Sequence, residues 1–254
     1  MIPLVVAHNT FREATRDRLL AGIVTAGLLM LGGTQILGTL ALGEGRRITV
    51  DLGLSSIALL GMFVVLLVGT SLVAKEIERR TIFNLLSRPI VRHEYLIGKW
   101  AGLSAALWVV CAILGFALWL VLAVRGGQGF GAGVAQAVFL TGLELSVVTA
   151  IAVLFSALST PVLSALYTLA FYLIGQWSYD LRGFAERAPE PLGMVLSGVA
   201  NVVPNLPLFN MRALASAAHG TSVDHLLIAM LYALTYCGCA LALATAAFES
   251  RDFK

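Results

Sequence analysis

Six long runs of apolar residues alternate with polar segments along the chain. The runs are Leu19–Leu42, Leu52–Ala74, Trp100–Val124, Val134–Leu158, Pro161–Tyr179 and Leu226–Phe248. Each is close to the roughly 20 residues that a helix needs to cross about 30 Å of hydrocarbon. The runs are continuously apolar rather than alternating, and backbone in lipid must bond within its own segment. The pattern predicts an all-α integral membrane protein with six transmembrane helices.

The composition supports a lipid environment. Hydrophobic residues make up 59% of the chain and charged residues 12%, and the mean hydropathy is +0.89. Soluble domains are roughly 45–50% apolar and about 25% charged. So few charges do not cover a water-facing surface, which excludes a soluble enzyme, a disordered protein, a collagen and a secreted disulfide scaffold. The net charge of +3 indicates no nucleic-acid partner.

The distribution of Lys and Arg predicts the orientation. With the N-terminus inside, eleven of the 17 cations fall in the inner segments. Positive charge concentrates on the cytoplasmic side of membrane proteins. The sequence therefore predicts that both the N- and the C-terminus are cytoplasmic.

An amphipathic pattern occupies residues 1–18, before the first run. Apolar and small residues recur there at helical spacing, at Leu4, Ala7, Phe11 and Ala14. Charged residues fall on the other faces. The pattern predicts a helix that lies in the cytoplasmic interface. It acts either as an elbow against the bundle or as a flanking helix that only fixes orientation.

A 45-residue segment, 180–224, separates the last two runs on the outer side. Two helical periodicities occur in it, over residues 192–203 and 208–218, with a break at Asn205 between Pro204 and Pro207. Each helix is too short to span the membrane. We expect either an extracytoplasmic re-entrant hairpin or a pair of helices on the outer headgroups.

The most informative inner segment is 75–99, between the second and third runs. It contains six cations, three acids and an apolar set that includes Ile82, Leu85 and Leu86. Pro89 disfavours helix at the residue before it, so we expect one helix to about Leu86 and a second from near Val91. A short amphipathic helix at the membrane surface suits docking into a partner's groove. The alternative is a charged interfacial loop.

The chain lacks the usual motifs of an enzyme. No phosphate-binding G-x-x-x-x-G-K-[ST] loop, zinc-binding H-E-x-x-H helix or G-x-S-x-G elbow occurs in it. The G-x-x-x-G spacing of Gly98–Gly102 predicts local helix packing. We therefore expect no catalytic residue, no metal site and no cofactor in this chain.

Glu144 is the one formally charged residue within the six runs. A carboxylate at membrane depth is costly and normally faces the bundle interior or a wet cavity. Two interpretations remain open. Glu144 either lies on a translocation path, as a proton, cation or substrate site, or it is a structural acid bonded to a neighbouring helix.

The segment 75–99 resembles the cytoplasmic coupling segment of ABC-2-type transporter permeases. The matching residues are Glu76, Glu78, Thr81, Leu85-Leu86-Ser87, Pro89, Arg92 and Gly98-Lys99. Arg80 departs from the family pattern, which commonly has glycine before the threonine. The resemblance extends to the elbow helix, the six spans, the outer segment and the Arg-Asp-Phe tail, so it covers nearly the whole chain at the level of layout.

The resemblance implies a single permease domain, 1–254, of a type V exporter-like transporter in a bacterial inner membrane. A separate cytoplasmic ATPase dimer would hold ATP and Mg, and a second permease copy or a similar chain would complete the path through the lipid. The implied ATPase-coupling residues are Glu76, Glu78, Arg79, Arg80, Thr81, Ile82, Leu85, Leu86, Pro89 and Arg92. The alternatives are a membrane anchor for an assembly and a membrane-embedded lipid-modifying enzyme.

Overall fold

The computed structural model describes residues 2–40, 44–70, 92–124, 126 and 131–249. All of the regular secondary structure in these ranges is helical. The helices are α1 (Ile2–Arg16), α2 (Arg18–Leu40), α3 (Gly45–Val64), α6 (Arg92–Val124), α7 (Gly131–Leu158), α8 (Pro161–Gln176), α9 (Ser178–Arg187), α10 (Glu190–Val202), α11 (Arg212–Ser216) and α12 (Val223–Glu249). A π-helical turn η1 (Val65–Gly69) extends α3, and a 3-10 turn η2 (Leu206–Phe209) precedes α11.

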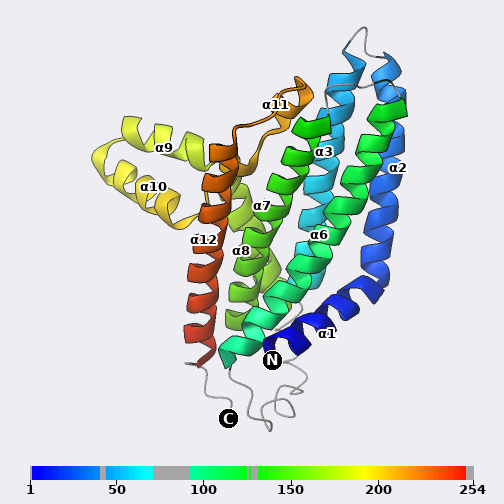
Figure 1. Ribbon diagram of the computed structural model, residues 1–254. Helices are drawn as coiled ribbons and strands as arrows, with labels where there is room; N and C mark the ends of the chain where they lie inside the picture. The colour runs from blue at the N-terminus through cyan, green and yellow to red at the C-terminus, as the bar shows by residue number, and fades with distance from the viewer. Residues whose placement is uncertain (1, 41–43, 71–91, 125, 127–130, 250–254) are drawn as a thin grey trace.

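Five of these helices are long and apolar enough to cross a membrane: α2, α3 with η1, α6, α7 and α12. They run side by side in one bundle (Figure 1). In α7, 72% of the most apolar stretch is buried, against 22% in α2 and 28% in α12. The core is therefore built around α7, and α2 and α12 lie at the rim with faces left for lipid or a partner.

Several helix ends differ from the ends of the apolar runs. α3 begins at Gly45 rather than Leu52, and α6 begins at Arg92 rather than Trp100. Helices continue past the hydrocarbon because their backbone bonds are internal and do not depend on apolar side chains. The fifth run gives α8, which has only 16 residues and ends at Gln176 rather than Tyr179.

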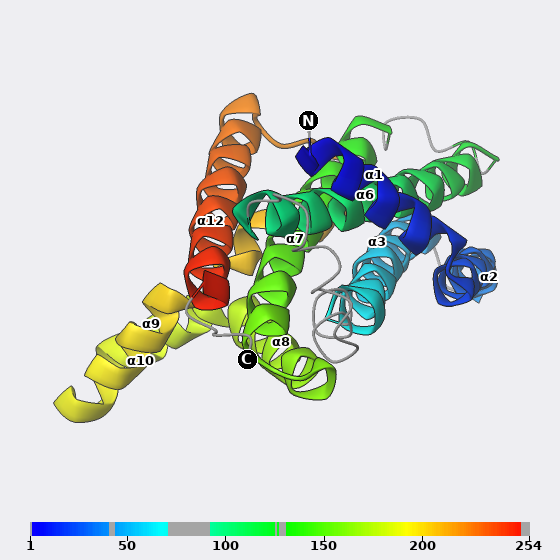
Figure 2. The same ribbon diagram turned by 90° about the horizontal axis from the view of Figure 1, so that it is seen from below.

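The N-terminal segment is helical, as expected. Figure 2 shows α1 crossing the first turns of α6 at the end of the bundle where α12 finishes. The helix exposes Leu4 and Val5 and buries Thr10 and Ala14. The chain turns at Asp17, whose Oδ1 accepts a 2.9 Å hydrogen bond from the Leu19 amide and so caps α2.

The outer segment leaves the bundle and returns to it. α9 and α10 pack on each other as a hairpin that projects on the side opposite α2 (Figures 1 and 2). The first expected short helix is α10, and the second is divided into η2 and α11. The two halves, Glu190–Val202 and Leu206–Ser216, meet at 45°. They count as one broken span or as a re-entrant loop.

Candidate functional site

Most of the residues expected to couple the chain to an ATPase lie outside the described residues. These are Glu76, Glu78, Arg79, Arg80, Thr81, Ile82, Leu85, Leu86 and Pro89. The described chain reaches this segment at Thr70 and resumes in α6, which begins at Arg92. The expected second helix, running into the third span, is therefore present as one continuous helix.

The first turns of α6 hold α1 in close contact through two glycines. A Cβ on Gly98 would lie 2.7 Å from the Cβ of Val6 and 2.9 Å from the Pro3 carbonyl oxygen. A Cβ on Gly102 would overlap the Ala7 carbonyl oxygen. Helix α1 thus packs directly on the expected Gly98–Gly102 motif of α6. The two glycines have no side chains, which lets the helices approach closely.

A buried lysine lies between these glycines. Lys99 is 3% exposed, and its Nζ lies 3.9 Å from Glu13 Oε2 on α1 and 5.7 Å from the ring centroid of Tyr95. Tyr95 stacks on Phe248 near the end of α12, with ring centroids 6.5 Å apart. The start of α6 therefore contacts both the first and the last helix of the chain.

Two tryptophans of α6 bind the same serine of α7. Trp100 donates its Nε1–H to the Ser146 carbonyl oxygen at 3.0 Å, and Trp108 donates to the Ser146 hydroxyl at 3.2 Å. The hydroxyl in turn donates to the Gly142 carbonyl oxygen at 2.8 Å. Because polar groups at membrane depth need partners, this cluster fixes the relative register of α6 and α7.

Glu144 points into the bundle and is 3% exposed. Its Oε1 accepts a hydrogen bond from Nε2 of Gln176, the last residue of α8. The carboxylate of α7 is therefore bonded to the point where the short helix α8 stops. The structural alternative expects such a bond to a neighbouring helix, and a role of Glu144 on a translocation path stays a prediction.

Arg212, on α11, faces the same region. Its Nη1 donates to the Ser55 hydroxyl of α3 at 3.3 Å, and its guanidinium attracts the Glu144 carboxylate electrostatically. Arg212 falls in the segment 180–224, which the sequence places on the outer side. The sequence contains one hint of this position. Arg212 is a lone cation within the apolar stretch 206–218, just as Glu144 is a lone acid within its apolar run.

The residues at the break between α10 and η2 form hydrogen bonds with α12. The Asn205 amide donates to the Tyr232 hydroxyl at 2.8 Å, and the Tyr236 hydroxyl donates to the Val202 carbonyl oxygen at 3.0 Å. The Ser178 hydroxyl donates to Asn205 Oδ1 at 3.1 Å. Backbone groups left open by the break thus find partners inside the protein, as irregular backbone at membrane depth requires.

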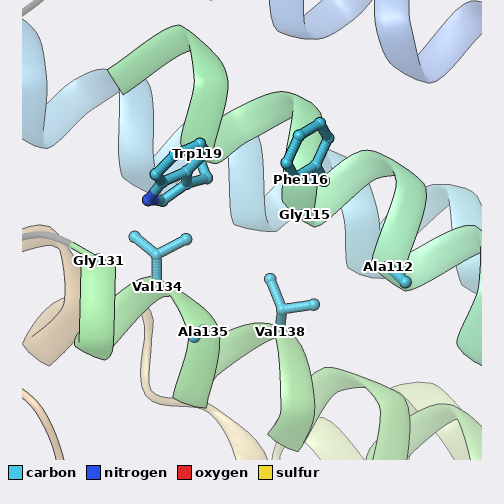
Figure 3. Close-up of a pocket in the computed structure, with 8 residues that line it drawn as sticks. All are labelled: Ala112, Gly115, Phe116, Trp119, Gly131, Val134, Ala135 and Val138. Carbon is cyan, nitrogen blue, oxygen red and sulfur yellow. The ribbon is translucent and has the colours of Figure 1, made fainter. Parts of the chain in front are cut away.

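A shallow apolar cavity of about 260 Å³ lies between α6 and α7. Figure 3 shows Val134 and Val138 pointing from α7 toward α6, with Trp119 above Val134. The lining has little polar surface, and Trp119 and Phe116 are partly exposed. Such a surface is suited to contact with hydrocarbon and offers no group for chemistry.

The described residues were also compared with the arrangement that a metal centre needs. No three His, Cys, Asp or Glu side chains within them are arranged to hold a metal ion. Glu144 has the Gln176 amide as its hydrogen-bond partner. What the arrangement provides is mechanical: polar and close-packed contacts that join α6 to α1 and α12, and α7 to the outer segment.

The comparison with protein families agrees with this arrangement. A search of curated proteins gave no match. The profile of the family described as ABC-2 family transporter protein matches residues 4–253, which is nearly the whole chain. Members of this family are membrane permeases that work with ABC ATPase partners and are generally not catalytic themselves. The chain therefore belongs to the ABC-2 transporter family, as a membrane permease component of an ABC transporter.

Proposed function

We propose that this permease couples ATP hydrolysis by a separate cytoplasmic ATPase dimer to the export of a substrate, in a bacterial inner membrane with both termini cytoplasmic. The observation that carries the proposal is the family match over residues 4–253. ATP binding does work only if the complex in one arrangement binds ATP better than in the other. The permease must therefore contain elements that pass a cytoplasmic movement into the bundle.

The segment 75–99 is the proposed contact with the ATPase. Glu76, Glu78, Arg79, Arg80 and Arg92 supply charge, while Ile82, Leu85 and Leu86 supply the apolar seat, with Thr81 and Pro89 shaping the turn. Its continuation supports the proposal, because α6 runs without interruption from Arg92 to Val124. A movement at Arg92 would therefore be delivered directly to a full span.

A second permease copy is the proposed partner within the membrane. Large apolar side chains remain exposed along α12 and the α9–α10 hairpin, among them Leu231, Leu234 and Met194. For Glu144 we propose an indirect part in the path: it holds the end of α8 and the returning outer segment in place. ATP and Mg belong to the ATPase subunit.

Purification of the tagged chain from its native membrane in mild detergent tests the proposal. We expect a soluble subunit with phosphate-loop and signature motifs to co-purify near one to one, identified by mass spectrometry. Leu85→Asp combined with Arg80→Glu should abolish this association, whereas Leu243→Asn, on an exposed part of α12, should not. Recovery of the chain alone, or with a partner lacking ATP-binding motifs, would favour the anchor or enzyme alternative.

A further inference from the structure

We infer that the first turns of α6 act as a joint that makes α1, α6 and the end of α12 move together when the coupling segment moves. The joint consists of Tyr95, Gly98, Lys99 and Gly102. The inference rests on the proposed function, since the movement would come from the ATPase. It assigns positioning roles to residues in the first turns of α6, which follow the residues proposed to contact the ATPase.

The α1 branch of the joint is a close contact between the α6 backbone and α1. Gly98 faces Val6 and the Pro3 carbonyl, and Gly102 faces the Ala7 carbonyl and the Phe11 amide. A flexible side chain between two helices absorbs a displacement by changing rotamer, but backbone in direct contact does not. A shift of α6 must therefore be followed by α1.

Lys99 strengthens this branch. Its ammonium group is buried and keeps Glu13 of α1 within 3.9 Å. Separating α1 from α6 would remove that countercharge from a buried cation, which is costly. The contact therefore opposes sliding of α1 along α6.

The α12 branch is an aromatic contact. Tyr95 is 4% exposed and Phe248 is 1% exposed, and their rings are stacked at an interplanar angle of 22°. Both rings are rigid and enclosed, so a shift of the α6 start displaces the end of α12. Because α12 runs unbroken from Val223 to Glu249, the displacement reaches its outer end.

The last described residues before the coupling segment, Gly69 and Thr70, pack close to the same part of α6. A Cβ on Gly69 would lie 3.0 Å from Leu103 Cδ2, and the Thr70 carbonyl accepts a 2.9 Å hydrogen bond from Ser156 of α7. The two points at which the segment joins the described bundle are thus connected through α6. A movement of the segment is delivered to the joint from both sides.

The test uses the permease–ATPase complex with the natural cysteines, Cys111, Cys237 and Cys239, replaced by alanine. Two reporters are introduced one at a time: His8→Cys on α1 and Asp224→Cys at the outer start of α12, both exposed positions. Maleimide labelling is compared with and without ATP plus vanadate, together with the ATPase rate. In the parent complex we expect nucleotide to change the labelling rate at both reporters by about threefold or more.

One variant disrupts the α1 contact of the joint, and another disrupts its α12 contact. Gly102→Ala should remove the nucleotide response at His8→Cys and keep it at Asp224→Cys. Phe248→Ala should do the reverse, while Phe248→Tyr, which keeps the ring contact, should behave as the parent. All three should retain assembly and ATP hydrolysis. A purely structural role would change both reporters together and lower the ATPase rate.

Gly115→Ala is the matched control. It lies on the same helix, and its added Cβ would lie 2.9 Å from Val138 Cγ1 of α7, so it adds the same methyl group to α6 against a side chain outside the joint. Both responses should survive. If Gly102→Ala does not fold, Glu13→Gln tests the same branch through a side chain that is 63% exposed.

The outcomes separate the two proposals. An active complex in which the parent reporters do not respond, or in which the joint variants respond like the parent, overturns the joint and leaves the proposed function standing. Failure of the parent chain to assemble with any ATPase overturns the proposed function itself.

Discussion

At the scale of single residues, polar side chains inside the bundle form hydrogen-bonded pairs, and the sequence indicates one member of a pair but not its partner. Glu144 stands out as a lone charge in an apolar run, and the structural alternative predicted that it bonds to a neighbouring helix. Its partner Gln176 is an ordinary residue at a helix end. Which uncharged residue meets a buried acid depends on where α8 stops, and no local pattern in the chain determines that.

Replacing Glu144 should therefore affect stability according to hydrogen-bonding capacity. Glu144→Leu leaves the Gln176 amide without its acceptor and Arg212 without a nearby anion, so we expect unfolding to become easier by about 1–3 kcal/mol. Glu144→Gln retains an acceptor oxygen and should cost less. Thermal unfolding in detergent measures the difference.

Thr235→Val serves as the control, because the Thr235 hydroxyl is exposed and bonds within its own helix. The electrostatic part is measured by combining Glu144→Gln with Arg212→Gln. If the two residues interact, the double variant loses less stability than the sum of the single variants. A Glu144→Leu variant as stable as the parent protein would contradict the structural role.

At the scale of elements, apolar periodicity predicted helices well and their ends less well. The five long spans follow from continuous apolar runs, and α1 follows from its amphipathic spacing. The start of α6 at Arg92 was expected from Pro89. The early end of α8 was not expected, because no proline or charged residue interrupts the run before Asp180.

The bend between α10 and η2 gives an element-scale prediction. Tyr232→Phe removes the acceptor of the Asn205 amide while keeping the ring, which lies 6.1 Å from Phe209. Loss of one hydrogen bond is worth about 1 kcal/mol, so amide exchange at Asn205 should accelerate by roughly fivefold.

Hydrogen exchange with mass spectrometry, read on peptides covering residues 200–210, checks this expectation. Tyr167→Phe is a suitable control, since Tyr167 lies on α8 and packs against Phe155. Tyr236→Phe should leave the Asn205 amide protected, because its hydroxyl donates to Val202 instead. Equal protection in the Tyr232→Phe variant and the parent would show that the tyrosine does not hold the break.

At the scale of the whole molecule, the family and the layout were predictable from the sequence, and the connections between helices were not. The match over residues 4–253 agrees with the resemblance drawn from the segment 75–99. The meeting of α1, α6 and α12 joins residues from both ends of the chain. Such long-range contacts depend on how the helices pack, and a single sequence contains no direct signal for them.

The proposed orientation is tested on the intact cell. The His8→Cys variant should resist a membrane-impermeant maleimide until the membrane is permeabilised, whereas the Asp224→Cys variant should react at once. The reason is the excess of Lys and Arg in the inner segments. The opposite labelling pattern would reverse the sidedness and would place the segment 75–99 out of reach of a cytoplasmic ATPase.

The paired binding of Ser146 by Trp100 and Trp108 has a spectroscopic consequence. These two indoles are partly buried and hydrogen-bonded, whereas Trp119 and Trp177 are 47% and 63% exposed. Lipids brominated along their chains should therefore quench only part of the intrinsic fluorescence. The unquenched part comes from the α6–α7 contact, so the protein contains its own optical probe of that contact.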